Sequence, residues 1–142
     1  MAYSVLIVDD SVPMRSVIKK TVKASGFNVG QFFEASNGKE AMEILNKEWL
    51  DLVLTDYNMP DMDGLELVDT MKKDELLQTI PVIMITTEGS QQRIEEFTEK
   101  GIAGYIKKPF TPEEVKHKLN FIIGETEDGE ESFDNSNEEL DF

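Results

Sequence analysis

The sequence alternates five times between a short apolar segment and an amphipathic one, and this alternation restricts the fold more than any other feature. Three apolar runs, "VLIV" (5–8), "LVL" (52–54) and "VIMI" (82–85), are continuous. Continuous runs are typical of strands covered on both faces, because a half-exposed strand alternates apolar and polar residues. We expect strands within the segments 3–8, 26–35, 51–56, 80–86 and 103–107.

A helix is expected after each strand, from apolar spacing and from capping residues. After "DDS", Met14, Val17, Ile18 and Val22 recur at the spacing of one helical face, and Ser11 is the expected N-cap. Further helices are expected within 37–48, 64–73, 90–101 and 111–124, with Asn37 and Thr111 as caps and Glu114 completing a capping box. Strict alternation of strand and helix predicts an α/β fold, an open parallel sheet with helices on both faces.

Charge and composition exclude several classes of function. The formal net charge is −15, with 29 acidic residues against 14 basic ones, so binding to nucleic acid or to an anionic membrane is disfavoured. The absence of cysteine excludes disulfides and thiolate metal sites. The N-terminus has no basic region before its apolar run, and no run is long enough to span a bilayer. We expect a soluble, cytoplasmic monomer.

Three carboxylates are predicted to meet at one edge of the sheet. Asp9 and Asp10 follow the first strand and Asp56 ends the third, and ligand sites of open α/β sheets lie at the carboxyl ends of the strands. Clustered carboxylates repel one another unless a cation is present. Because the expected ligands are all oxygens, the cation is expected to be hard, Mg²⁺ before Ca²⁺. Thr86 ends the fourth strand and Lys108 follows the fifth, and their hydroxyl and ammonium suit a phosphoryl group carried on a carboxylate.

Four segments carry a resemblance to a known family: "DDS" (9–11), "LTDYNMPDMDG" (54–64), "MITTEG" (84–89) and "GYIKKPF" (104–110). In this order and spacing they resemble the receiver domains of two-component response regulators, most closely the single-domain chemotaxis regulators. The resemblance covers about residues 3–123. It implies a flavodoxin-like (βα)5 fold with strand order 2-1-3-4-5.

The resemblance also implies roles for the residues at the carboxyl edge. Asp56 matches the phosphoacceptor. Asp10 matches a direct Mg²⁺ ligand, Asn58 a ligand through its backbone carbonyl, and Asp9 a ligand acting through water. Mg²⁺ is therefore the expected cofactor.

Further matches concern the switch that follows phosphorylation. Thr86 matches the switch hydroxyl, Tyr105 the aromatic ring that changes rotamer with it, and Lys108 the phosphate-binding lysine, whose bond to the following proline is expected to be cis. Asn58 and Glu88 match the positions that tune dephosphorylation.

Two positions depart from the family pattern. Thr87 stands where a smaller residue is usual, and Lys107 where an apolar residue is more common. We expect Lys107 to point away from Lys108, on the opposite face of the strand.

The function implied is that of a stand-alone signalling switch rather than an enzyme. A histidine kinase phosphorylates Asp56, the face formed by the fourth helix, fifth strand and fifth helix changes, and a partner binds there, with the flagellar motor switch favoured. A relay intermediate or phosphate sink that exchanges phosphate with a histidine phosphotransfer protein is the alternative, and a phosphatase partner is also considered.

Two other classes are weighed against the switch. An aspartyl-nucleophile phosphatase usually has a second acid two residues after the nucleophile, where this chain has Asn58. A nucleotide or flavin binder would have a glycine-rich loop after the first strand, where this chain has "DDSVPM".

The domain is placed at 1–124 and an acidic, disordered tail at 125–142. The tail has nine acidic residues and no basic one, interrupted by Phe133, Leu140 and Phe142. Two interpretations stay open, a solvating tail or a segment that docks on a partner or on the domain's own output face.

Overall fold

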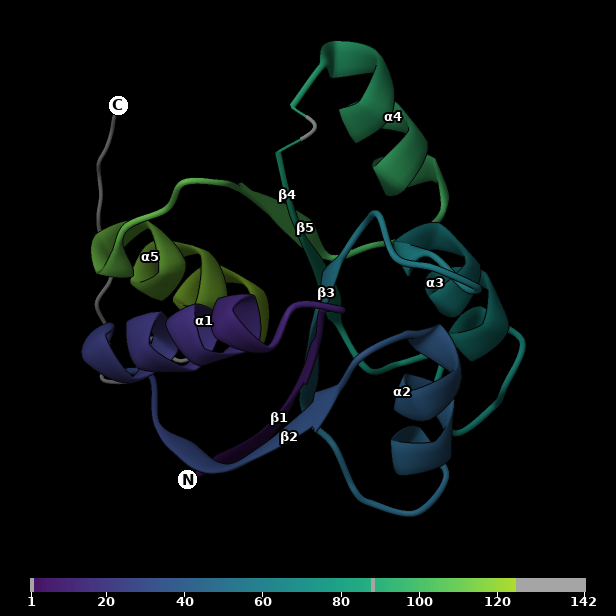
Figure 1. Cartoon of the computed structure of the whole chain (residues 1–142), viewed down its shortest axis with the longest axis horizontal. Helices are drawn as coiled ribbons and strands as arrows, with labels where there is room; N and C mark the ends of the chain where they lie inside the picture. Colours follow the sequence, from purple (N-terminus) through teal and green to yellow (C-terminus); the bar gives the residue numbers. More distant parts are fainter. Residues whose placement is uncertain (1, 88, 125–142) are drawn as a thin grey trace.

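The structure, a computed structural model, describes residues 2–87 and 89–124 and consists of one parallel sheet between two layers of helices (Figure 1). The strands lie in the order β2-β1-β3-β4-β5 and all neighbouring pairs are parallel. The predicted fold class and strand order are therefore confirmed. In chain order the elements are β1 (Tyr3–Val8), α1 (Val12–Ala24), β2 (Val29–Ala35), α2 (Gly38–Leu45), β3 (Leu52–Asp56), α3 (Gly64–Lys72), β4 (Val82–Thr86), α4 (Gln91–Glu99), β5 (Gly104–Lys107) and α5 (Pro112–Ile123).

The continuous apolar strands are buried on both faces, as their sequence predicts. In β1, Val5 and Ile7 point into the core beneath α1 and α5, and Leu6 and Val8 into the core beneath α2 and α3. All four side chains are fully buried. Figure 1 shows α1 and α5 on one side of the sheet and α2 and α3 on the other. The core therefore holds the central strands from both sides and leaves only their ends free for chemistry.

The predicted helix starts are present. Ser11, Asn37 and Thr111 each accept a hydrogen bond from the backbone N–H three residues on, and Thr111 forms the expected capping box with Glu114. Asp63 forms a second capping box at α3. These caps fix where each helix leaves the strand edge.

The prediction for Val17 was wrong. Ile18 and Val22 are buried, but the side chain of Val17 is 47% exposed. Consecutive helical residues are about 100° apart, and the apolar stripe of α1 is narrower than the sequence pattern indicates.

The strand register brings the predicted site residues to one edge. Val8 of β1 lies opposite Thr55 of β3, so Asp9 follows at the level of Asp56. Thr86 of β4 lies opposite Lys107 of β5, directly before Lys108.

Within residues 2–87 and 89–124, no helix has both the length and the apolar character that a membrane crossing requires. The predictions for Glu88 and for the tail 125–142 lie outside the described residues.

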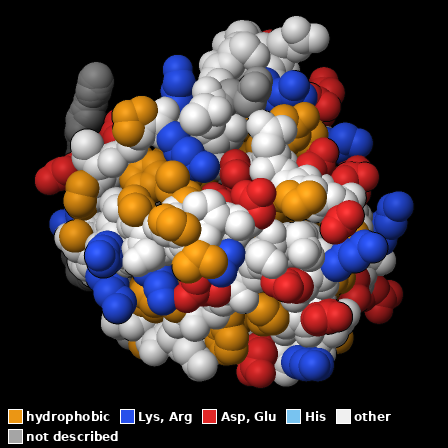
Figure 2. Space-filling view, in the orientation of Figure 1, with side chains coloured by type: hydrophobic (Ala, Val, Ile, Leu, Met, Phe, Trp, Pro, Cys, Tyr) orange, Lys and Arg blue, Asp and Glu red, His pale blue; other side chains and the backbone are white. Residues whose placement is uncertain are grey.

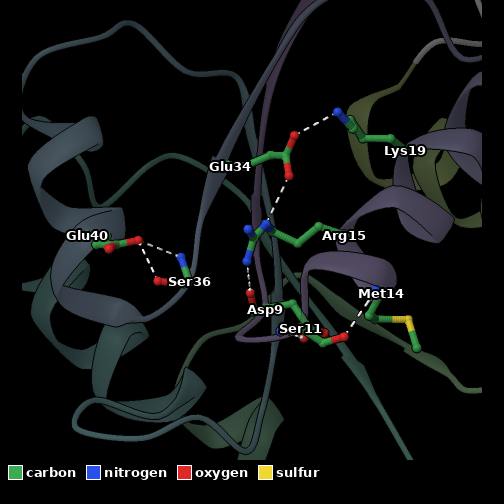
Figure 3. A network of polar contacts seen from close by, with 8 residues as sticks. All are labelled: Asp9, Ser11, Met14, Arg15, Lys19, Glu34, Ser36 and Glu40. Carbon is green, nitrogen blue, oxygen red and sulfur yellow. Dashed lines mark hydrogen bonds and ion pairs between the residues drawn. The ribbon is translucent and has the colours of Figure 1, made fainter.

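A charged network ties α1 to the edge strand β2 (Figure 3). Arg15 Nε lies 2.9 Å from Glu34 Oε1, and Lys19 Nζ lies 2.6 Å from Glu34 Oε2. The hydrogen bonds from Lys19 and then Arg15 lower the pKa of Glu34 below its ordinary 4.5. Because a third of the Glu34 side chain is exposed, solvent screens these ion pairs and limits their contribution to stability.

Glu34→Gln should lower the free energy of unfolding at neutral pH by about 1 kcal/mol. The pKa of Glu34 is lower in the folded state, so its stabilising contribution is complete above pH 4.5 and is lost as the pH falls through the folded value. Urea unfolding of both proteins between neutral and acidic pH measures the difference. Glu43→Gln, an exposed change on α2, serves as the control. A difference that persisted unchanged in acid would contradict this assignment.

Candidate functional site

The three predicted carboxylates meet at the carboxyl edge of the sheet. Asp9 and Asp10 follow β1 and Asp56 ends β3, and each offers a carboxylate oxygen within 4.8 Å of the others. Asp9 is buried, Asp56 is partly buried and Asp10 is exposed. Figure 2 shows acidic side chains gathered near the centre of one face, beside hydrophobic side chains that lie over α1. The site is thus open to solvent on the Asp10 side and closed beneath Asp9.

Every polar group of Asp9 forms a hydrogen bond except one carboxylate oxygen. Its backbone N–H donates to Ala35 at 3.0 Å, its carbonyl accepts from Arg15 at 2.6 Å, and its Oδ1 accepts from the Ser11 N–H at 2.9 Å. Its Oδ2 is buried and has no hydrogen-bond partner among the described residues. A buried carboxylate oxygen without a partner is costly. This oxygen therefore faces a position suited to a positive group.

Lys108 supplies one positive charge to the cluster. Its Nζ lies 3.6 Å from Asp9 Oδ2 and 3.6 Å from Asp56 Oδ1. Its backbone N–H donates to the Thr86 carbonyl at 2.8 Å, so β4 fixes the lysine at the end of β5. One ammonium against three carboxylates leaves two negative charges uncompensated.

The pKa of Asp56 is raised above its ordinary 3.8. Burial is the main cause, and the charges of Asp9 and Asp10 add to it. Lys108 and the Tyr57 N–H, which donates to Asp56 Oδ1 at 2.8 Å, oppose the rise. The surroundings thus make the negative form of Asp56 less favourable than that of a free aspartate, and added positive charge would oppose this effect.

The donor set fits a hard divalent cation. The clustered donors are carboxylate oxygens, and one of them, the buried Asp9 Oδ2, accepts no hydrogen bond from the described residues. Mg²⁺ prefers oxygen ligands and tolerates one or two carboxylates with water. The residues expected to hold it are Asp10, Asp56 and the backbone carbonyl of Asn58, with Asp9 acting through water. Asn58 lies in the exposed loop after Asp56, and its carbonyl ligation stays a prediction.

The predicted switch residues lie on the two strands beyond Asp56. Thr86 ends β4 and is buried, with 1% of its surface exposed. Tyr105 of β5 is partly buried against a small cluster formed by Leu65, Met84 and Phe97. Lys118 of α5 places its Nζ 5.3 Å from the centre of the Tyr105 ring. Thr86 and Tyr105 therefore sit on neighbouring strands, and their roles as a switch stay predictions.

The two adjacent lysines reach different surroundings, as expected. Lys108 faces the carboxylates, whereas Lys107 is exposed and its side chain lies along Gly89 in the β4–α4 loop. A Cβ on Gly89 would stand 2.9 Å from the Lys107 Cδ, a contact that the exposed lysine side chain could relieve by shifting. The Lys108–Pro109 bond is cis, as the resemblance implied.

The sequence analysis missed Tyr57, which joins the site to α4. Its ring lies 5.4 Å from the ring of Phe97 and 4.6 Å from the Arg93 guanidinium. Its backbone N–H contacts Asp56. The one available signal was an aromatic residue directly after the strand-terminal aspartate.

An open parallel sheet with this acidic edge is the architecture of receiver domains, and the family comparison agrees. Residues 5–120 match the response regulator receiver domain family, and the chain belongs to it. Its members are signalling switches and generally use Mg²⁺.

The relatives found include chemotaxis proteins. CheY-3 of Vibrio cholerae is 43% identical over 119 residues, which cover 84% of this chain and 90% of that protein. CheY1 of Helicobacter pylori is 42% identical over 120 residues, which cover 84% of this chain and 95% of that protein. The resemblance to CheY-type receivers expected from the motifs is thereby confirmed.

Solved structures show the same fold. The chemotaxis response regulator CheY4 of Vibrio cholerae superposes with a TM-score of 0.76 at 31% identity, covering 86% of this chain and 99% of that one. A putative response regulator from Chloroflexus aurantiacus gives a TM-score of 0.79 at 26% identity, covering 87% and 99%.

Asp56→Asn should raise the melting temperature at neutral pH in the absence of divalent cations. The change removes a buried charge that Asp9 and Asp10 repel, while the amide oxygen still accepts from Tyr57. We expect a change of about 1 kcal/mol, the typical size for a single substitution, which corresponds to roughly 4 °C by differential scanning calorimetry. Asp61→Asn, in the same loop but exposed, is the matched control. A lower melting temperature for Asp56→Asn would mean that the Lys108 contact outweighs the repulsion.

Proposed function

We propose that this chain is a phosphorylation switch that accepts a phosphoryl group on Asp56 from the phosphohistidine of a histidine kinase. The observation that carries the proposal is the placement of Asp56 Oδ1 at 3.6 Å from Lys108 Nζ, beside the buried Asp9 Oδ2, which accepts no hydrogen bond from the described residues. A nucleophilic carboxylate needs positive charge around the incoming phosphoryl oxygens. Lys108 supplies part of that charge, and the surrounding carboxylates are suited to hold the cation that would supply the rest.

In the proposed reaction an Asp56 carboxylate oxygen attacks phosphorus. The new P–O bond forms as the P–N bond to the kinase imidazole breaks, and the leaving nitrogen keeps the electron pair and takes a proton. Bound Mg²⁺ would neutralise charge on the phosphoryl oxygens. Lys108 contributes a second positive charge, and the Tyr57 N–H orients the carboxylate.

The output would follow from Thr86 and Tyr105. The phosphoryl group draws the Thr86 hydroxyl towards Asp56, and Tyr105 moves into the space that the threonine leaves. This is a two-state change biased by local charge. Tyr105 also lines a groove of about 520 Å³ between β5 and α5, together with Lys107 and His117. A rotamer change of Tyr105 therefore alters the floor of a surface groove.

The partner favoured for that surface is a flagellar motor switch protein, since the relatives are chemotaxis proteins. A phosphorelay role, passing phosphate to a histidine phosphotransfer protein, is the second candidate. It is kept because the acceptor edge alone serves both roles. Asn58 tunes the phosphoryl lifetime in either case.

Incubation with a small phosphodonor such as phosphoramidate should add one phosphoryl group in the presence of Mg²⁺ and none after chelation. Intact-protein mass spectrometry measures the addition. Asp56→Asn should abolish it, because the amide is not a nucleophile, whereas Asp61→Asn should leave it unchanged. Phosphoryl addition to Asp56→Asn would move the acceptor to another residue.

Beryllofluoride with Mg²⁺, a mimic of the phosphoryl group on Asp56, should be required for capture of a motor switch protein from native extract. The Thr86→Ala variant should still accept phosphate but no longer capture the partner, because without the hydroxyl Tyr105 no longer responds to the phosphoryl group. If a kinase or phosphotransfer protein is captured instead, and the mimic weakens its hold, the relay function replaces the chemotaxis one.

A further inference from the structure

One side chain outside the predicted site touches the backbone of a predicted site residue. The guanidinium of Arg15, on α1, donates from Nη1 to the Asp9 carbonyl at 2.6 Å and from Nε to Glu34 at 2.9 Å (Figure 3). Only 13% of the Arg15 side chain is exposed. Arg15 thus bridges the loop that carries two site carboxylates and the edge strand β2.

The hydrogen bond to the Asp9 carbonyl also restricts the backbone orientation of Asp10. That carbonyl and the Asp10 N–H belong to one planar peptide group, so holding the oxygen fixes the plane from which the Asp10 side chain departs. The rest of Asp9 is already fixed by Ala35 and Ser11. Asp10 itself is exposed, so packing does little to set its direction.

Arginine suits this position better than lysine would. Its planar fork presents several N–H groups in fixed directions and reaches two partners at once. Glu34 anchors one side of the fork, and Lys19 holds the other oxygen of Glu34 at 2.6 Å. Glu34 is shared between Arg15 and Lys19, so it offsets only part of their charge. What distinguishes Arg15 from Lys19 is the directed hydrogen bond to the Asp9 carbonyl.

We propose that Arg15 is a positioning residue for divalent-cation binding, which sets the Asp9–Asp10 peptide so that the Asp10 carboxylate faces the ion. This inference rests on the proposed Mg²⁺ site. The competing explanation is that the network only fastens α1 to β2. Lys19 separates the two, because it pairs with the same Glu34 from the same helix.

The test is the Mg²⁺ dissociation constant of the full chain, measured by isothermal titration calorimetry with Mg²⁺ alone. Arg15→Gln should weaken binding about tenfold, the effect expected when a partner that orients metal ligands is removed. Lys19→Gln, which weakens the same network away from Asp9, should leave the constant within about twofold of wild type. Arg15→Lys keeps the charge but not the fork, and should weaken binding nearly as much as Arg15→Gln.

A second readout separates positioning from loss of fold. In ¹H–¹⁵N spectra without Mg²⁺, Arg15→Gln should shift the Asp10 amide while the core amides of β1 stay in place. Should Arg15→Gln not fold, Arg15→Lys carries both measurements.

Equal Mg²⁺ affinity in wild type and the Arg15 variants, or equal losses in Arg15→Gln and Lys19→Gln, would overturn the inference. Absence of Mg²⁺ binding by the wild-type chain would overturn the proposed function itself. The two failures are therefore distinct.

Discussion

The mutual repulsion of Asp9, Asp10 and Asp56 is the constraint on which the rest of the site depends. Their oxygens approach within 4.8 Å, and two unit charges at that distance repel by roughly 3 kcal/mol at an effective dielectric of 20. The chain tolerates this because β1 and β3 are neighbours whose side chains are buried on both faces. Each fully buried aliphatic side chain contributes roughly 1.5–3 kcal/mol, so a few core residues offset the repulsion that the edge stores.

That stored repulsion makes the edge responsive to charge. Lys108 offsets part of it. Asp9 Oδ2, which pairs with Lys108 but accepts no hydrogen bond from the described residues, marks where more positive charge is accommodated. In the proposed cycle a bound cation lowers the repulsion between the carboxylates. A phosphoryl group on Asp56 then adds negative charge to the site again. Asp56 is held at the end of a strand and Asp9 by its hydrogen bonds, and both restraints keep these carboxylates in place against the repulsion.

The sequence predicted what depends on local pattern and missed what depends on contacts between distant segments. Alternation of strands and helices predicted the layers, and the strand-terminal aspartates predicted the acidic edge. The strand order came only from the family resemblance, since alternation alone permits several orders. Arg15 was missed because its partner Glu34 is 19 residues away. Val17 was misplaced because spacing gives the direction of a helical face and not its width.

The attachment of α4 shows why such a site can reach a distant surface. In Figure 1, α4 stands apart from the layer formed by α2 and α3. Its one buried side chain is Phe97, which packs in a small cluster against Leu65 and Met84. Elements with few buried apolar contacts open at low free energy. In the proposed cycle a small bias at the site would therefore be enough to move this helix.

Two tyrosines, Tyr57 and Tyr105, pack against that same cluster. Tyr57 shares the peptide bond with Asp56 and packs on Phe97, while Tyr105 lies one strand beyond Thr86. Phosphorylation would disturb both, since the hydrogen bond from the Tyr57 N–H goes to Asp56 Oδ1. Both tyrosines pack near Phe97 of α4, so movement of either one would change the position of this helix. Phe97 is therefore the residue through which phosphorylation would alter the surface formed by α4.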